Sequence, residues 1–141
     1  MAFREKLAWI SVATMSLVYG WYFWTILPLA RTGAGSAWHY AKLLQGTIIT
    51  VVVLQIVLTV AAAALSPREA RAPEDEREKL ITLRGTRIAY FVLVTGALCV
   101  CVAGLFFDTN SLLLGNYALM AVVVANLVKD FTQIVQYRLA G

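Results

Sequence analysis

The chain has 141 residues, of which 60% are hydrophobic and only 14% are charged, with a formal net charge of +4. A soluble domain of this length is nearer half apolar and about a quarter charged, so the composition excludes an ordinary soluble domain. In the one long hydrophilic segment, residues 66–87, six bases nearly balance five acids. Because such acids repel phosphates as strongly as the bases attract them, direct binding of nucleic acid is not expected.

Four apolar runs each reach the roughly 20 residues that a transmembrane helix needs. They predict helices over about residues 7–29, 43–65, 73–107 and 112–137, of which the third includes a charged cytoplasmic start. The connections are short, which leaves no room for a soluble domain. We therefore predict one membrane domain over residues 1–141, an all-α integral membrane four-helix bundle.

The distribution of positive charge predicts the orientation of these helices. With the N-terminus inside, ten of the twelve Lys and Arg residues fall on the inner side, and only Arg31 and Lys42 fall on the outer side. Basic residues accumulate in cytoplasmic loops. We therefore expect the N and C termini and the central hydrophilic segment to be cytoplasmic.

The outer part of the first helix is crowded with aromatic residues, which are Tyr19, Trp21, Tyr22, Phe23 and Trp24. Amphipathic rings prefer the headgroup level, so we interpret the cluster as an interfacial belt. The single histidine, His39, follows in the outer loop and is expected to be solvated. One histidine cannot hold a haem between two imidazoles, and no other ligands lie near it, so no metal site and no cofactor are predicted.

Polar residues interrupt the second and fourth helices. Gln55 lies near the middle of the second helix, and the fourth carries a stripe at helical spacing formed by Asn126, Asp130, Gln133 and Tyr137. Polar groups are costly in lipid and should face other helices. Our favoured interpretation is an amide contact between Gln55 and Asn126, which lie at similar depth. The alternative is a polar path through several copies of the chain, lined by Gln55, Asn126 and Asp130.

The third helix carries small residues seven apart, Ala89, Gly96 and Ala103, which predict a close helix contact. Its two cysteines, Cys99 and Cys101, are two residues apart and point to nearly opposite sides of a helix, so they cannot pair with one another. No nucleophile, base and orienting group converge in the sequence. We therefore predict no catalytic residues and a protein that is not an enzyme.

The central segment offers a contact surface for a partner of the chain. Its acidic turn should stand clear of the membrane, and the residues assigned to partner binding are Glu74, Asp75, Glu76, Arg77 and Glu78. Arg84 and Arg87 should lie at headgroup depth beside anionic lipid. A buried acid in a membrane needs a partner, so Asp130 is expected to pair with one of these two arginines. A plain solvated helix start is the alternative.

The sequence Asp-Glu-Arg-Glu at residues 75–78, with the pattern that follows it to Tyr90, resembles a group of small bacterial four-helix membrane proteins of unknown function. Residues 5–11 and 128–137 are similar to that group too. Such proteins are often encoded beside small helix-turn-helix transcription regulators. The resemblance implies a multi-pass protein of the bacterial inner (cytoplasmic) membrane that belongs to a regulatory pair, and it supplies no catalytic residue.

Together these observations predict a non-enzymatic interaction or regulatory protein whose segment 66–87 docks a cytoplasmic partner, such as a transcription regulator. Membrane lipid and further copies of the chain are the other expected partners. The alternative function is an oligomeric transport or channel subunit with a polar path from the second and fourth helices.

Overall fold

The computed structural model describes residues 3–32, 36–70, 75–107 and 110–139. These form the helices α1 (Phe3–Thr32), α2 (Ala37–Leu65), α3 (Pro67–Ala70), α4 (Glu76–Phe106) and α5 (Ser111–Leu139). Four of them, all except the short α3, are long and apolar enough to cross a membrane. The prediction of an all-helical protein is confirmed, and the length and composition of the four long helices suggest a multi-pass membrane protein.

The long helices extend beyond the apolar runs because polar residues cap their first turns. Ser36 accepts a hydrogen bond from the backbone N–H of His39 at 3.3 Å, and Asp75 accepts one from the backbone N–H of Glu76 at 2.8 Å. Such side chains satisfy N–H groups that have no partner within the helix. As a result α2 begins at Ala37 rather than near residue 43, and α4 begins at Glu76. Pro73, the expected start of that helix, lies outside the described residues.

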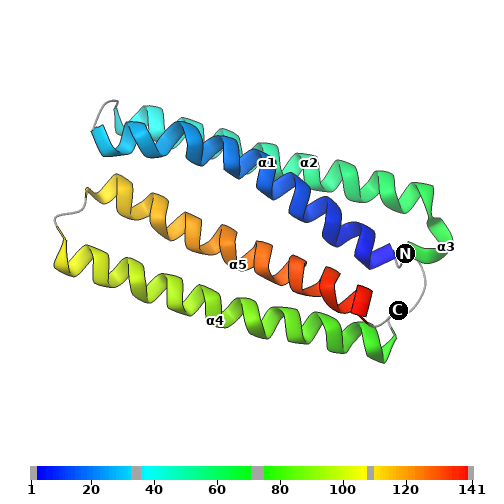
Figure 1. Ribbon diagram of the computed structural model, residues 1–141. Helices are drawn as coiled ribbons and strands as arrows, with labels where there is room; N and C mark the ends of the chain where they lie inside the picture. Colours follow the sequence, from blue (N-terminus) through cyan, green and yellow to red (C-terminus); the bar gives the residue numbers. More distant parts are fainter. Residues whose placement is uncertain (1–2, 33–35, 71–74, 108–109, 140–141) are drawn as a thin grey trace.

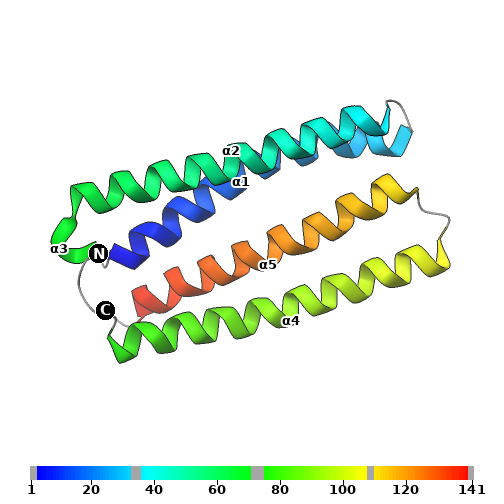
Figure 2. The same cartoon turned by 180° about the vertical axis from the view of Figure 1, so that it is seen from behind.

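The four long helices lie side by side in the order α2, α1, α5, α4 (Figures 1 and 2). α1 packs on α2 and α5, and α5 packs on α1 and α4. Both chain ends and α3 lie at one end of the bundle, which we call the terminal end (Figure 1). We call the opposite end, where α1 leads into α2 and α4 leads into α5, the loop end. The bundle is open, because α2 and α4 form its edges.

The buried core near the loop end is formed by Tyr22, Ile26 and Ala30 of α1 with Tyr40 of α2. Tyr22 is only 2% exposed, whereas Trp21 and Trp24 of the same helix are 60% and 85% exposed. The interpretation of this cluster as an interfacial belt is therefore wrong for Tyr22. Neighbouring residues of a helix point about 100° apart, so the cluster is divided between the core and the outer surface.

Helices α4 and α5 approach each other closely at two glycines of α4. A Cβ atom on Gly96 would lie 2.7 Å from the Cβ of Ala121, and one on Gly85 would lie 3.1 Å from the backbone oxygen of Lys129. The predicted role of Gly96 in close packing is confirmed. Gly85 lies within the continuous helix α4, where its missing side chain makes room for α5.

Replacing Gly96 by Val should destabilise the α4–α5 contact, because the new side chain would overlap Ala121. Overpacking of this kind costs about 1–3 kcal/mol. Gly115→Val is the matched control, since a Cβ atom there meets nothing within 4 Å. Unfolding of both variants by sodium dodecyl sulfate, followed by circular dichroism in mild detergent, measures the difference. Equal stability of the two variants would contradict this account of the contact.

Candidate functional site

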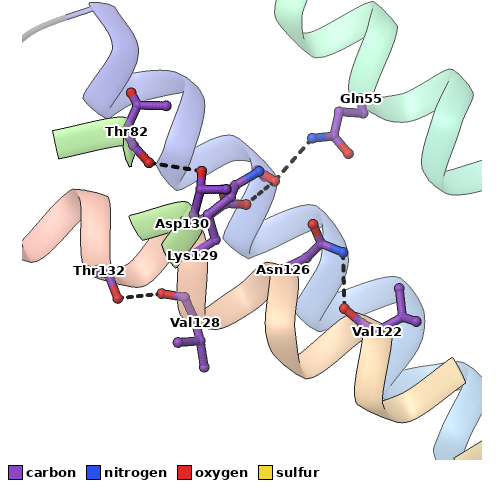
Figure 3. Close-up of polar contacts among 10 residues, drawn as sticks. Gln55, Thr82, Val122, Asn126, Val128, Lys129, Asp130 and Thr132 are labelled. Carbon is purple, nitrogen blue, oxygen red and sulfur yellow. Dashed lines mark hydrogen bonds and ion pairs between the residues drawn. The ribbon is translucent and has the colours of Figure 1, made fainter. Parts of the chain in front are cut away.

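Three helices meet at a group of polar side chains that we call the polar cluster, formed by Ser11 of α1, Gln55 of α2, and Lys129 and Asp130 of α5. The hydroxyl of Ser11 donates to Oδ2 of Asp130 at 2.5 Å, and Nε2 of Gln55 donates to Oγ of Ser11 at 3.1 Å. Nζ of Lys129 lies 3.4 Å from Oδ1 of Asp130. Figure 3 shows Gln55 extending from α2 toward Asp130 on α5.

The polar cluster lies at hydrocarbon depth if the four long helices cross a bilayer. Each has 29–31 residues and at about 1.5 Å per residue spans about 44–46 Å, close to the full bilayer thickness. Ser11, Gln55 and Asp130 lie eight, ten and nine residues from the terminal ends of their helices. They are thus about 12–15 Å from that end, deeper than the headgroup layer of about 7 Å that surrounds a core of about 30 Å.

The carboxylate of Asp130 is almost completely buried, because only 4% of the residue is exposed. A charge removed from water is strongly unfavourable unless it is paired and hydrogen-bonded. Ser11 supplies the hydrogen bond and Lys129 supplies the opposite charge, while the side chain of Lys129 keeps 35% of its surface exposed. The polar cluster therefore satisfies the acid of α5 and joins α5 to α1 and α1 to α2.

The expected ion pair of Asp130 with Arg84 or Arg87 is wrong. Both arginines are exposed, and within the part of the chain that the structure describes neither lies within 4.0 Å of a carboxylate oxygen. The reason is the rotation of α4. Gly85 faces α5, so its neighbour Arg84, about 100° away around the helix, points elsewhere. Placement of the two arginines beside lipid headgroups remains a prediction.

The expected contact between Gln55 and Asn126 is also wrong. Nδ2 of Asn126 donates to the backbone oxygen of Val122 at 3.0 Å within its own helix, as Figure 3 shows, while Gln55 bonds to Ser11. Gln133 packs against Gly85 of α4. On α5, therefore, Asp130 faces α1, Gln133 faces α4, and Asn126 bonds within its own helix.

Two ion pairs close the terminal end of the bundle. Nε of Arg4 lies 3.3 Å from Oε2 of Glu78, which joins α1 to α4, and Nε of Arg138 lies 3.6 Å from Oε1 of Glu5, which joins α5 to α1. The guanidinium of Arg138 also lies over the ring of Trp9, 5.8 Å from its centre. Glu78, predicted to bind a partner, is thus engaged within the chain.

The remaining residues predicted for partner binding are exposed where the structure describes them. Asp75 caps α4, and Glu76 and Arg77 are exposed in its first turn. Glu74 lies outside the described residues. The accessible part of the predicted docking surface is therefore the start of α4, residues 75–77.

Sequence reasoning missed a second polar link between α1 and α5, near the loop end. The hydroxyl of Tyr22 donates to Oδ1 of Asn116 at 2.9 Å, and Nδ2 of Asn116 donates to the backbone oxygen of Leu112 at 2.8 Å. It also missed Ser11 and Glu5 of α1. The sequence does contain one signal, because Ser11 and Thr14 are polar residues one turn apart in an apolar helix, and such residues are expected to face other helices. Both are buried in the structure.

Among the described residues, no three His, Cys, Asp or Glu side chains come together as metal ligands. Cys99 and Cys101 are both exposed free thiols, and His39 is exposed. The chain matches no protein-family model, no curated protein and no solved structure. The function proposed below therefore rests on the sequence and geometry of the chain itself.

A double-mutant cycle with Ser11→Ala and Asp130→Ala should give a coupling energy between about 0.6 kcal/mol, the average for side-chain hydrogen bonds between membrane helices, and about 1.7 kcal/mol, the largest such value. The coupling arises because the hydroxyl of Ser11 donates to the carboxylate. Unfolding free energies in mild detergent provide the measurement.

The matched control pairs Asp130→Ala with Arg84→Ala and with Arg87→Ala, and there the coupling should be near zero, since neither arginine contacts the acid. Coupling to an arginine as large as the coupling to Ser11 would restore the ion pair expected from the sequence and contradict the polar cluster.

Proposed function

We propose that the chain is a non-enzymatic interaction or regulatory protein of the bacterial inner membrane, oriented with both termini cytoplasmic, whose α4 start docks a soluble partner. The observation that carries this proposal is that the polar groups at membrane depth are bonded to one another, whereas exposed polar groups are found at the terminal end. At membrane depth, Ser11, Gln55 and Asp130 are bonded to one another across three helices. At the terminal end, Glu76 and Arg77 remain exposed.

The distribution of charge supports a cytoplasmic terminal end. Ten of the twelve basic residues fall on the inner side of the predicted topology, and basic residues accumulate on the cytoplasmic side. A cytoplasmic regulator is then the natural class of partner, as the resemblance to small membrane proteins encoded beside helix-turn-helix regulators implies. The ion pairs of Arg4 and Arg138 join α1 to α4 and α5 to α1 next to the start of α4.

A second function, an oligomeric transport or channel subunit, is favoured by one observation, the burial of Asp130 at hydrocarbon depth. Ionisable residues in such positions frequently mark ion pathways. Three surface grooves of the molecule, however, have linings that include none of Gln55, Asn126 and Asp130. This function would need several copies of the chain to build a path, and flux through reconstituted vesicles that Asp130→Asn abolishes would establish it.

The docking proposal predicts that the combined variant Glu74→Gln, Asp75→Asn and Glu76→Gln loses the partner. Asn keeps the helix cap that Asp75 provides. Three surface charges at about 0.5 kcal/mol each sum to about 1.5 kcal/mol, a roughly tenfold loss of affinity. Capture from native membranes in nanodiscs, quantified by mass spectrometry against wild type, measures this loss.

Glu78→Gln is the matched control, because it removes an acid from the same turn that is paired with Arg4. It should retain the partner. If wild type and both variants recover only further copies of the chain, the docking proposal fails. If Glu78→Gln loses the partner as completely as the triple variant, the surface has been assigned to the wrong face of α4.

A further inference from the structure

A groove of about 460 Å³ runs between α1 and α2 on the outside of the bundle. Its lining includes Leu17, Val18 and Trp21 of α1 and Lys42, Leu43 and Gly46 of α2. A Cβ atom on Gly46 would meet nothing within 4 Å, so the groove is open where this residue lacks a side chain. The hydroxyl of Thr47, which also lines the groove, donates to the backbone oxygen of Leu43 at 2.8 Å and needs no water. The groove is therefore suited to an apolar chain.

The groove begins at headgroup depth and continues into the hydrocarbon layer. Lys42 lies five residues after the start of α2, and Gly46 lies nine residues after it. At about 1.5 Å per residue these positions are about 8 Å and about 14 Å from the loop end of the helix. The ammonium of Lys42 lies 5.2 Å from the ring centre of Trp38, which is 69% exposed. A cation thus stands at the mouth of an apolar groove, beside an aromatic ring typical of the membrane interface.

Charge identifies the ligand that this arrangement fits. Among the described residues of the loop end, Lys42 and Arg31 are the only Lys, Arg, Asp or Glu side chains, and Asp108 lies outside the described residues. A lysine near the membrane surface favours anionic headgroups. The grooves on the α4–α5 face and along α1 near Gly20 have no cation in their linings, so they offer no selection among headgroups.

We propose that the α1–α2 groove is a binding site for an anionic phospholipid of the leaflet at the loop end. The phosphate of the lipid pairs with the ammonium of Lys42, and one acyl chain lies along the groove over Gly46. The site depends only on the chain spanning a membrane and is independent of the docking surface at the opposite end of the molecule.

Two tryptophans of the site make it measurable in the full chain. In a background with Trp9→Phe and Trp24→Phe, Trp21 and Trp38 are the only tryptophans, so selective excitation of tryptophan reports on the site. The protein is reconstituted in phosphatidylcholine vesicles that contain increasing amounts of chain-brominated phosphatidylglycerol or chain-brominated phosphatidylcholine. Quenching should favour the anionic lipid roughly fivefold in apparent association constant, the effect of one lysine near the surface.

Four variants separate the site from a general surface effect. Lys42→Gln should bring the ratio of association constants near one, whereas Arg31→Gln, which removes the other exposed cation of this end, should leave it unchanged. Gly46→Leu should fill the groove and reduce quenching by both lipids. Gly20→Leu is its matched control, since it lies in the groove along α1 and also has open space around it. Unchanged helicity by circular dichroism confirms that each variant folds.

Equal quenching of the wild-type groove by the two lipids would overturn the proposal, as would selectivity that survives Lys42→Gln. An equal loss of selectivity in Arg31→Gln would assign the preference to the general charge of the loop end. An unchanged signal in Gly46→Leu would show that the acyl chain lies elsewhere.

Discussion

The buried carboxylate of Asp130 is the constraint on which the arrangement of the helices depends. A charged residue within the hydrocarbon layer is costly, by about 2.5–3.5 kcal/mol at the centre of a membrane helix on insertion scales. The structure offsets this cost with the hydroxyl of Ser11 and the ammonium of Lys129. Because Ser11 in turn accepts from Gln55, one acid determines which helix lies beside α5 and which side of α2 faces α1.

The same turn of α5 determines its contact with α4. With Asp130 directed to α1, the backbone of Lys129 and the side chain of Gln133 lie against Gly85. A Cβ atom on Gly85 would lie only 3.1 Å from the backbone oxygen of Lys129, so the absence of a side chain favours this rotation of α4. Arg84 and Arg87 are then exposed and turned away from the acid of α5. A single buried charge and a single glycine thus orient three neighbouring helices.

The sequence predicts the helices of this fold but not the contacts between them, and the reason is physical. Membrane-spanning segments are recognised by length and mean hydropathy, which need no knowledge of neighbours, and all four were predicted. Contacts depend on helix order and rotation, and in a membrane both the lipid-facing and the packed residues are apolar. The open order α2, α1, α5, α4 was therefore not predictable, and Asp130 was assigned an arginine of the adjacent helix rather than a serine of α1.

Tyr22 and Gly96 show where pattern reasoning fails and where it succeeds. An amphipathic ring suits both an interface and a buried hydrogen bond, so the aromatic cluster alone did not reveal that Tyr22 bonds to Asn116. A small residue in a membrane helix has one principal use, close approach of another helix, and Gly96 has that use. Residue types with one physical role are predictable from sequence, whereas residue types with two require the neighbours to be known.

In this molecule, polar groups at hydrocarbon depth hold the helices together, whereas exposed polar groups at the two ends are available to binding partners. Within the hydrocarbon layer, Ser11, Gln55 and Asp130 have in-chain partners, and recruiting any of them for a ligand would first break a bond that holds the helices together. At the two ends, Glu76 and Lys42 are exposed, and the contact of Lys42 with the ring of Trp38 lies within α2 and joins no helices. Binding at the ends can therefore change without disturbing the bundle, which favours an interaction protein with separate surfaces for a soluble partner and for lipid.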